Sequence, residues 1–97
     1  MSAKEMFQEL GYKQYKHKDS ITYNHTCKTY DDFEGSEHRY EDRINFIEND
    51  EIGRFITTSR EEYINDYYEA FTLIPIDMPL LKAINQQCKE LGWIHND

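Results

Sequence analysis

The centre of the chain reads Arg39-Tyr40-Glu41-Asp42-Arg43-Ile44-Asn45-Phe46-Ile47-Glu48. Successive side chains of a strand point to opposite faces, so one face would carry Tyr40, Asp42, Ile44 and Phe46. The segment 49–53 has the length of a bulged or longer hairpin loop, and a run rich in β-branched and aromatic residues follows it over 54–58. This stretch predicts a central antiparallel hairpin.

A second hairpin is predicted before the central one. The runs 12–17 and 21–27 are rich in Tyr, Thr and Ile, and the polar segment 18–20 separates them. In the later run, one face would carry Ile21, Tyr23, His25 and Cys27. A polar, glycine-bearing loop over 31–37 then leads into the central hairpin.

Helices are expected at both ends of the chain. Ser2 and Glu5 have the spacing of a capping box, and Asp77-Met78-Pro79 is typical of a helix start. Both helices would end in Glu-Leu-Gly followed by an aromatic residue, at 9–12 and 90–93. Glycine is favoured directly after the last residue of a helix, so Gly11 and Gly92 predict where the two helices stop.

The C-terminal helix is expected to pack through one apolar stripe. That stripe would consist of Leu81, Ile84, Cys88 and Leu91, with Leu80 and Ala83 on its flank. The side chains expected to face solvent are Gln86, Gln87, Lys89 and Glu90. The two cysteines, Cys27 and Cys88, are expected to be free thiols, since no secretory signal accompanies them.

The segment 59–76 carries conflicting signals. Ser59-Arg60-Glu61-Glu62 repeats the capping-box spacing, whereas Phe71–Ile76 taken alone is typical of a strand. A helix through both Pro75 and Pro79 is excluded, because proline lacks the amide proton that a helix needs. We expect a short helical turn or irregular insert over 60–68 and an edge strand over 69–76.

These elements predict a single α+β domain over residues 1–97. It would contain an N-terminal helix, an antiparallel meander of about four strands, and a C-terminal helix packed on one sheet face. No run approaches the roughly 18 apolar residues that cross a bilayer, and no basic and apolar leader opens the chain. We therefore expect no membrane partner and a cytoplasmic location.

Acidic residues are concentrated in the middle of the chain. The net charge is −8, and residues 31–69 hold thirteen Asp and Glu residues against four Arg. Residues 1–30, by contrast, hold five Lys against three acids. The acidic middle disfavours nucleic acid and favours partners with a basic surface.

No signature of an enzyme or of a bound metal stands out. The chain lacks G-x-S-x-G, H-E-x-x-H, Walker A and G-x-G-x-x-G motifs. Adjacent acids on a strand point to opposite faces and would not converge on one site. His25 and Cys27 lack a second ligand pair at zinc spacing. We expect a non-catalytic protein without a cofactor.

Two binding surfaces can be proposed from the residue pattern. The acidic, tyrosine-bearing middle could imitate a phosphate backbone and occupy the basic groove of a nucleic-acid enzyme. Its partner-binding residues would be Asp31, Asp32, Glu34, Glu37, Glu41, Tyr63 and Tyr67. The alternative is a nucleic-acid-binding module that uses the Lys and Tyr residues of the hairpin 12–28.

The two ends of the chain resemble known proteins of one kind. Residues 3–7 with 9–12, and residues 76–93, are similar to small uncharacterised proteins encoded by phages and prophages of Gram-positive bacteria. The resemblance implies a context: an accessory protein that binds a host or phage protein, including defence nucleases, inside an infected or lysogenic cell. It transfers no functional residue.

Overall fold

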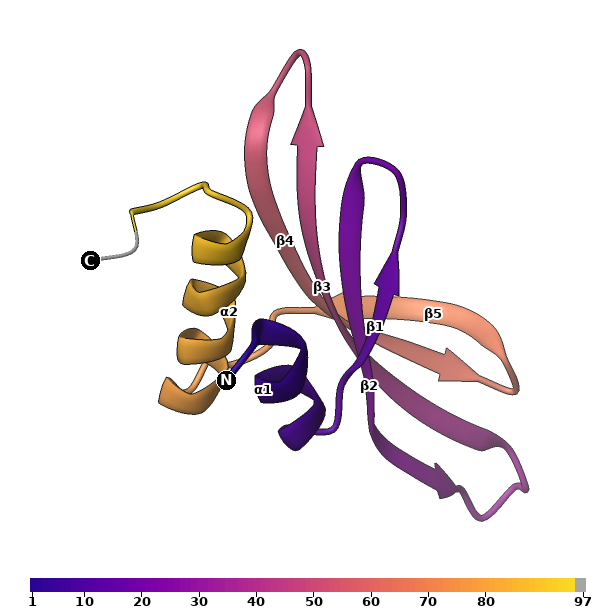
Figure 1. Ribbon diagram of the computed structural model, residues 1–97. Helices are drawn as coiled ribbons and strands as arrows, with labels where there is room; N and C mark the ends of the chain where they lie inside the picture. The colour runs from indigo at the N-terminus through magenta and orange to yellow at the C-terminus, as the bar shows by residue number, and fades with distance from the viewer. Residues whose placement is uncertain (96–97) are drawn as a thin grey trace.

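The computed structural model describes residues 1–95, which form two helices and one five-stranded sheet (Figure 1). Neighbouring strands are antiparallel, and the sheet order follows the chain. The α+β prediction is confirmed, with five strands in the meander where about four were expected. In chain order the elements are α1 Ala3–Glu9, β1 Lys13–Lys16, β2 Ser20–Asp31, β3 Glu37–Asn49, β4 Gly53–Ile64, β5 Tyr67–Thr72 and α2 Met78–Glu90.

The helices cover only part of the sheet. Figure 1 shows α1 and α2 on one side, with the β2–β3 hairpin and β5 extending away from them. The sheet residues of the core come from 12–26 and 42–57, which we call the helix-backed half. No residue of 27–41 or 58–72 is buried, and we call this the unbacked half. Across both halves, the helix face is the one that carries Tyr23 and Ile44, and the opposite face is the open face.

Aromatic rings fill the core beneath the helices. Phe7 of α1 is 0% exposed and stacks on Tyr23, with 3.8 Å between the ring centroids. Phe46 meets both rings edge-on. The Tyr23 hydroxyl donates to Gln87 Oε1 at 2.5 Å and accepts from Gln14 Nε2 at 2.9 Å, so this buried polar group is satisfied.

The inward stripe of α2 is rotated from the predicted one. Gln87 was expected to face solvent but is 4% exposed, and Leu81 was expected inside but is 45% exposed. The helix packs against α1 as well as the sheet, and the Tyr23 hydroxyl gives the Gln87 amide a buried partner. The stripe that is buried consists of Leu80, Ala83, Ile84, Gln87 and Cys88.

Both predicted helix ends are confirmed. Gly11 and Gly92 have φ values of 92° and 74°, which only glycine adopts without strain. The Tyr12 amide then donates to Phe7 O at 3.0 Å, and the Trp93 amide donates to Cys88 O at 2.9 Å. These are the hydrogen bonds of a Schellman motif, and they turn both aromatic residues toward the core.

The helical turn or irregular insert predicted over 60–68 is wrong, whereas the predicted edge strand exists with different boundaries. β4 runs on to Ile64, and β5 starts at Tyr67 after a two-residue turn. Asn65 and Asp66 both have positive φ, 49° and 68°, as a tight hairpin turn requires. The ladder with β3 extends to the His38–Ile64 pair and overrides the local helical spacing.

The last strand also ends earlier than predicted. β5 stops at Thr72 instead of residue 76. Ile74 leaves the sheet and packs into the core with 7% of its surface exposed, and Pro75 has no amide to donate to a ladder. The chain then crosses to α2, whose Asp77 cap accepts from the Leu80 amide at 3.0 Å.

Candidate functional site

A tight loop joins β2 to β3 at the far end of the unbacked half. Asp32 organises this loop, because its Oδ1 accepts from the Glu34 and Ser36 amides at 2.9 Å each. Its backbone amide also donates to Ser36 O at 2.9 Å, and the Gly35 amide donates to Asp32 O at 3.1 Å. Four hydrogen bonds therefore fix a loop of five residues, 32–36.

The carboxylate of Asp32 is held in its charged form. His38 Nε2 lies 2.9 Å from Asp32 Oδ2. This contact and the amides of Ser36 and Glu34 lower the pKa of Asp32 below its usual value. Asp32 therefore acts within the loop, and its oxygens are largely occupied before any partner arrives.

The loop presents an aromatic residue to solvent. Phe33 is 98% exposed at its tip. Asp31, Glu34 and Glu37 around it are exposed, and the ion pairs found within residues 1–95 include none of the three. An apolar ring thus stands among unpaired carboxylates on a rigid loop.

The β4–β5 turn is joined to the base of this loop. Asn65 exchanges two hydrogen bonds with Glu37: its amide donates to Glu37 O at 2.8 Å, and its Oδ1 accepts from the Glu37 amide at 2.9 Å. Tyr67 follows the turn and is 77% exposed. The loop and the turn therefore form one end of the sheet, which we call the acidic end: residues 31–37 and 65–67.

Stacked rings support the acidic end on the helix face. The Tyr30 ring stacks on the His38 ring, with 4.5 Å between their centroids. The Tyr40 ring is nearly parallel to the Tyr30 ring, with 6.4 Å between those two centroids. The Tyr40 hydroxyl donates to the Glu62 carboxylate, which raises the pKa of Tyr40. These contacts stiffen a part of the sheet that has no helix behind it.

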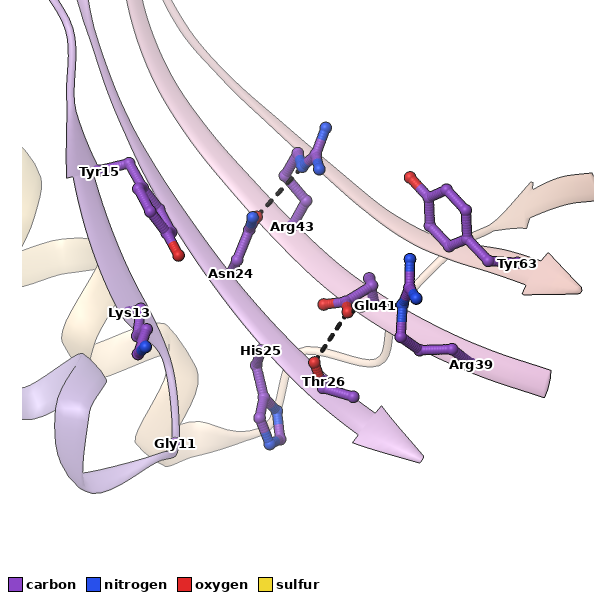
Figure 2. A pocket seen from close by; sticks show the side chains of 10 residues that line it. All are labelled: Gly11, Lys13, Tyr15, Asn24, His25, Thr26, Arg39, Glu41, Arg43 and Tyr63. Carbon is purple, nitrogen blue, oxygen red and sulfur yellow. Dashed lines mark hydrogen bonds and ion pairs between the residues drawn. The ribbon is translucent and has the colours of Figure 1, made fainter. Parts of the chain in front are cut away.

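The open face of the sheet is hollowed into a groove of about 500 Å³ (Figure 2). The two arginines that line it, Arg39 and Arg43, contact neighbouring carboxylate and amide side chains. Arg39 Nε lies 3.1 Å from Glu41 Oε1. The guanidinium carbon of Arg39 lies over the Tyr63 ring, 4.7 Å from the ring centroid. Arg43 donates to Asn24 Oδ1 at 3.1 Å and lies 3.5 Å from Glu61. The groove is lined by Gly11, Lys13, Tyr15, Asn24, His25, Thr26, Arg39, Glu41, Arg43 and Tyr63.

The predicted partner-binding residues fall into two groups. Asp31, Asp32, Glu34, Glu37 and Tyr67 come together at the acidic end. Glu41 and Tyr63 instead line the open-face groove. Glu41 accepts from the Thr26 hydroxyl at 2.8 Å as well as facing Arg39, so its charge is already shared within the sheet.

Sequence reasoning left Phe33 out of the partner-binding set. The available signal was a lone large apolar residue inside Asp31-Asp32-Phe33-Glu34-Gly35, a segment that otherwise has turn composition. A phenylalanine there has no strand neighbour that could bury it. Asp66 was also missed, and it pairs with Arg39 Nη1 at 2.5 Å.

A second hollow, of about 940 Å³, lies between the β1–β2 hairpin, the β3–β4 hairpin and the C-terminal end of α2. Ile21, Phe46, Leu91 and Trp93 contribute its apolar part. Its rim carries Lys16 and Lys18 from one hairpin and acidic residues from the other. Charges of both signs surround it, so it selects no single class of ligand.

The candidate metal ligands and the two thiols can be placed in the described part of the chain. Within residues 1–95, no group of three or more His, Cys, Asp and Glu side chains could hold a metal ion. Burial and the nearby Asp42 carboxylate raise the pKa of Cys27, whose thiol donates to Tyr40 O at 3.4 Å. A thiol in this state is a poor nucleophile. Cys27 and Cys88 are both free, as expected.

Comparisons with known proteins give no relative for this chain: no protein-family model, no curated protein and no solved structure matches it significantly. Neither helix in the described part of the chain has the length and apolar character needed to cross a membrane.

Proposed function

We propose that this protein is a non-catalytic accessory protein of the phage type, which binds a host or phage protein with a basic surface. The observation that carries the proposal is Phe33, 98% exposed on a hydrogen-bonded loop and surrounded by carboxylates. Binding hot spots are typically aromatic anchors of this kind. The surrounding acids would steer a basic partner and exclude acidic ones.

The rigidity of the loop supports a binding role. A flexible loop loses conformational entropy when it binds, whereas a loop already held by internal hydrogen bonds loses little. Asp32 holds the loop through the Glu34 and Ser36 amides, and Asn65 holds its base through Glu37. Phe33 is therefore presented in a fixed position before the partner arrives.

The partner class that fits best is an enzyme with a basic groove, such as a defence nuclease of the infected cell. Unpaired carboxylates at Asp31, Glu34 and Glu37 could occupy positions that nucleic-acid phosphates take in such a groove. The mimicry would be confined to the acidic end, because Glu41 and Glu61 are paired with arginines of the sheet. An anti-defence inhibitor acting in the host cytoplasm is the specific form of this proposal.

The test compares two hairpin tips of similar composition. The β3–β4 turn, 49–53, also carries two acids and an exposed apolar residue, Ile52, at 73% exposure. The loop variant combines F33A, E34K and E37K. The turn variant combines I52A, D50K and E51K, so both variants change the net charge equally.

Immobilised wild-type protein is used to capture partners from a host lysate, and the affinity of the purified partner is then measured for all three proteins. We expect the loop variant to bind at least about tenfold more weakly and the turn variant to bind like the wild type. Binding of the wild type should also fall steeply with salt. Equal losses in both variants, or no partner at all, would contradict the proposal.

A second candidate function is single-stranded nucleic-acid binding in the open-face groove. Figure 2 shows Lys13 and Tyr15 of β1 on the same side of the sheet as Arg43 and Tyr63. Cations and tyrosines on a sheet face can hold phosphates and stack bases. Fluorescence anisotropy with a single-stranded oligonucleotide at low salt tests this: K13E with Y15A should abolish binding, and the loop variant should not.

A further inference from the structure

The outer edge of β5 is an open strand edge. β5 is the last strand in the sheet order, so one side of its backbone pairs with β4 and the other faces outward. All six of its residues are exposed. An edge of this kind presents unpaired amides and carbonyls that can pair with another extended chain.

The opposite edge of the same sheet is protected where β5 is not. β1 has only four residues, and a lysine stands at each end, Lys13 and Lys16. Short length and lysine are common means of preventing edge pairing. β5 is longer and contains neither lysine nor proline. The difference marks β5 as the edge that remains available.

Apolar side chains line β5 and the residue after it. Tyr68 and Phe71 lie on the open face, opposite Tyr63 and Glu61 of β4, while Tyr67 lies on the helix face opposite Ile64. Glu69 is the one charged residue between 67 and 73, and it falls where the register with β4 shifts. The exposed fractions are 77% for Tyr67, 53% for Tyr68, 69% for Phe71 and 79% for Leu73.

Acidic residues surround this apolar edge. Glu62 lies beside it on β4, Glu69 lies on β5 itself and Asp77 follows it, and the ion pairs found within residues 1–95 include none of the three. The arginines nearest to it already have partners: Arg60 donates to both Asp42 oxygens, at 2.7 and 2.9 Å, and Arg39 pairs with Asp66. The edge therefore offers apolar contact with an excess of negative charge.

We infer that the outer edge of β5 binds an extended segment of the partner as a sixth strand, with apolar residues alternating with Lys or Arg. The apolar residues would lie against Tyr68 and Phe71 on the open face, and the basic residues would lie on the side of Glu62. A second copy of this chain fits less well, since it would bring another net charge of −8 to an acidic edge. The inference rests on the proposed function, because the segment belongs to the same basic partner.

The test uses a synthetic peptide of alternating valine and lysine as the probe. Two control peptides are matched to it: one alternates valine and glutamate, and the other has the same valines and lysines in two blocks. Binding is followed by the backbone amide signals of the ¹⁵N-labelled protein. We expect the alternating basic peptide to shift signals of Tyr67–Thr72 and slow their amide exchange, and both controls to bind at least about tenfold more weakly.

Two lysine variants locate the site. F71K adds a lysine to the β5 edge, and I52K adds one to an equally exposed apolar position in the β3–β4 turn. F71K should weaken peptide binding about tenfold and I52K should leave it unchanged. Because Phe71 is 69% exposed, F71K should fold normally, which its amide spectrum verifies.

Three results would overturn the inference. The first is peptide binding that does not depend on alternation, and the second is an effect of I52K equal to that of F71K. The third is a wild-type dimer in sedimentation that F71K disperses, which would make a second copy the occupant. The proposed function fails separately, through the loop variant and its captured partner, since F33A, E34K and E37K lie outside β5 and should leave peptide binding intact.

Discussion

The helix-backed half and the unbacked half of the sheet share the same strands but are held together differently. In the helix-backed half, cross-strand neighbours are apolar, as in the pairs Ile21–Phe46 and Tyr23–Ile44. In the unbacked half, most pairs between β3 and β4 include at least one charged side chain, as in Arg39–Tyr63 and Tyr40–Glu62, and the pair Asp42–Arg60 lies at the border of the two halves. The first half holds the fold through burial, and the second extends the same backbone ladder with side chains that are exposed or only partly buried.

The largest expected effect tests the claim that burial is confined to one half. F7A removes a ring that is 0% exposed, and it should lower the free energy of unfolding by about 3–5 kcal/mol. F71A, in the unbacked half, should change it by less than about 0.5 kcal/mol. Urea denaturation followed by circular dichroism measures both. A similar loss in both variants would remove the distinction between the halves.

The next effect tests the border between the halves. Asp42 is 5% exposed and receives two hydrogen bonds from Arg60. R60M leaves this buried carboxylate without its cation, and we expect a loss of about 2 kcal/mol. R54M is the matched control, because Arg54 and Glu48 form an exposed pair that contributes little. Equal denaturation midpoints for the two variants would show that Asp42 needs no cation.

A smaller effect is expected at the β4–β5 turn. N65A loses the side chain that accepts from the Glu37 amide and places alanine at a φ of 49°. We expect a loss of about 1 kcal/mol. N65G keeps the backbone freedom but also lacks the hydrogen bond, so it should fall between N65A and the wild type. If N65G matches N65A in thermal unfolding, the backbone conformation contributes nothing.

The smallest effect concerns the order of the loop as pH changes. The pKa of Asp32 is lowered in the folded protein, so its carboxylate stabilises the loop fully above its unfolded value of 3.8. That stabilisation is lost as pH falls through the lower folded value. Amide signals of Glu34 and Ser36 should therefore shift with acid in the wild type, and D32N should remove this titration. A wild-type midpoint above 3.8 would contradict the hydrogen-bond pattern.

Sequence patterns were informative where burial dictates them. The helix ends at Gly11 and Gly92, the central hairpin and the inward positions of Ile21 and Tyr23 follow from glycine conformation and alternation, and the structure confirms them. His25 and Cys27, predicted on the same face, are only partly buried, because the register with β3 shifts between Thr26 and Lys28. The stripe of α2 was misjudged because two surfaces, α1 and the sheet, share it, and because a tyrosine hydroxyl makes a buried Gln87 favourable.

The unbacked half was harder to predict for a physical reason. Its strands carry charged residues on both faces, so alternation disappears and the capping-box spacing at Ser59–Glu62 predicts a helix that does not form. The residues of the acidic end were largely predicted from the sequence. The roles of Asp32, which holds the loop, and of Phe33, which lies at its tip, depend on hydrogen bonds that composition does not reveal.

Hydrogen–deuterium exchange with the captured partner tests most directly whether the unbacked half is the binding half. The amides of 31–37 and 67–72 should exchange more slowly in the complex, while those of the β3–β4 turn, 49–53, should not change. The turn is the internal control, since its acids and exposed Ile52 resemble the loop in composition. Protection centred on 49–53 or on the helices, with 31–37 unaffected, would contradict the account.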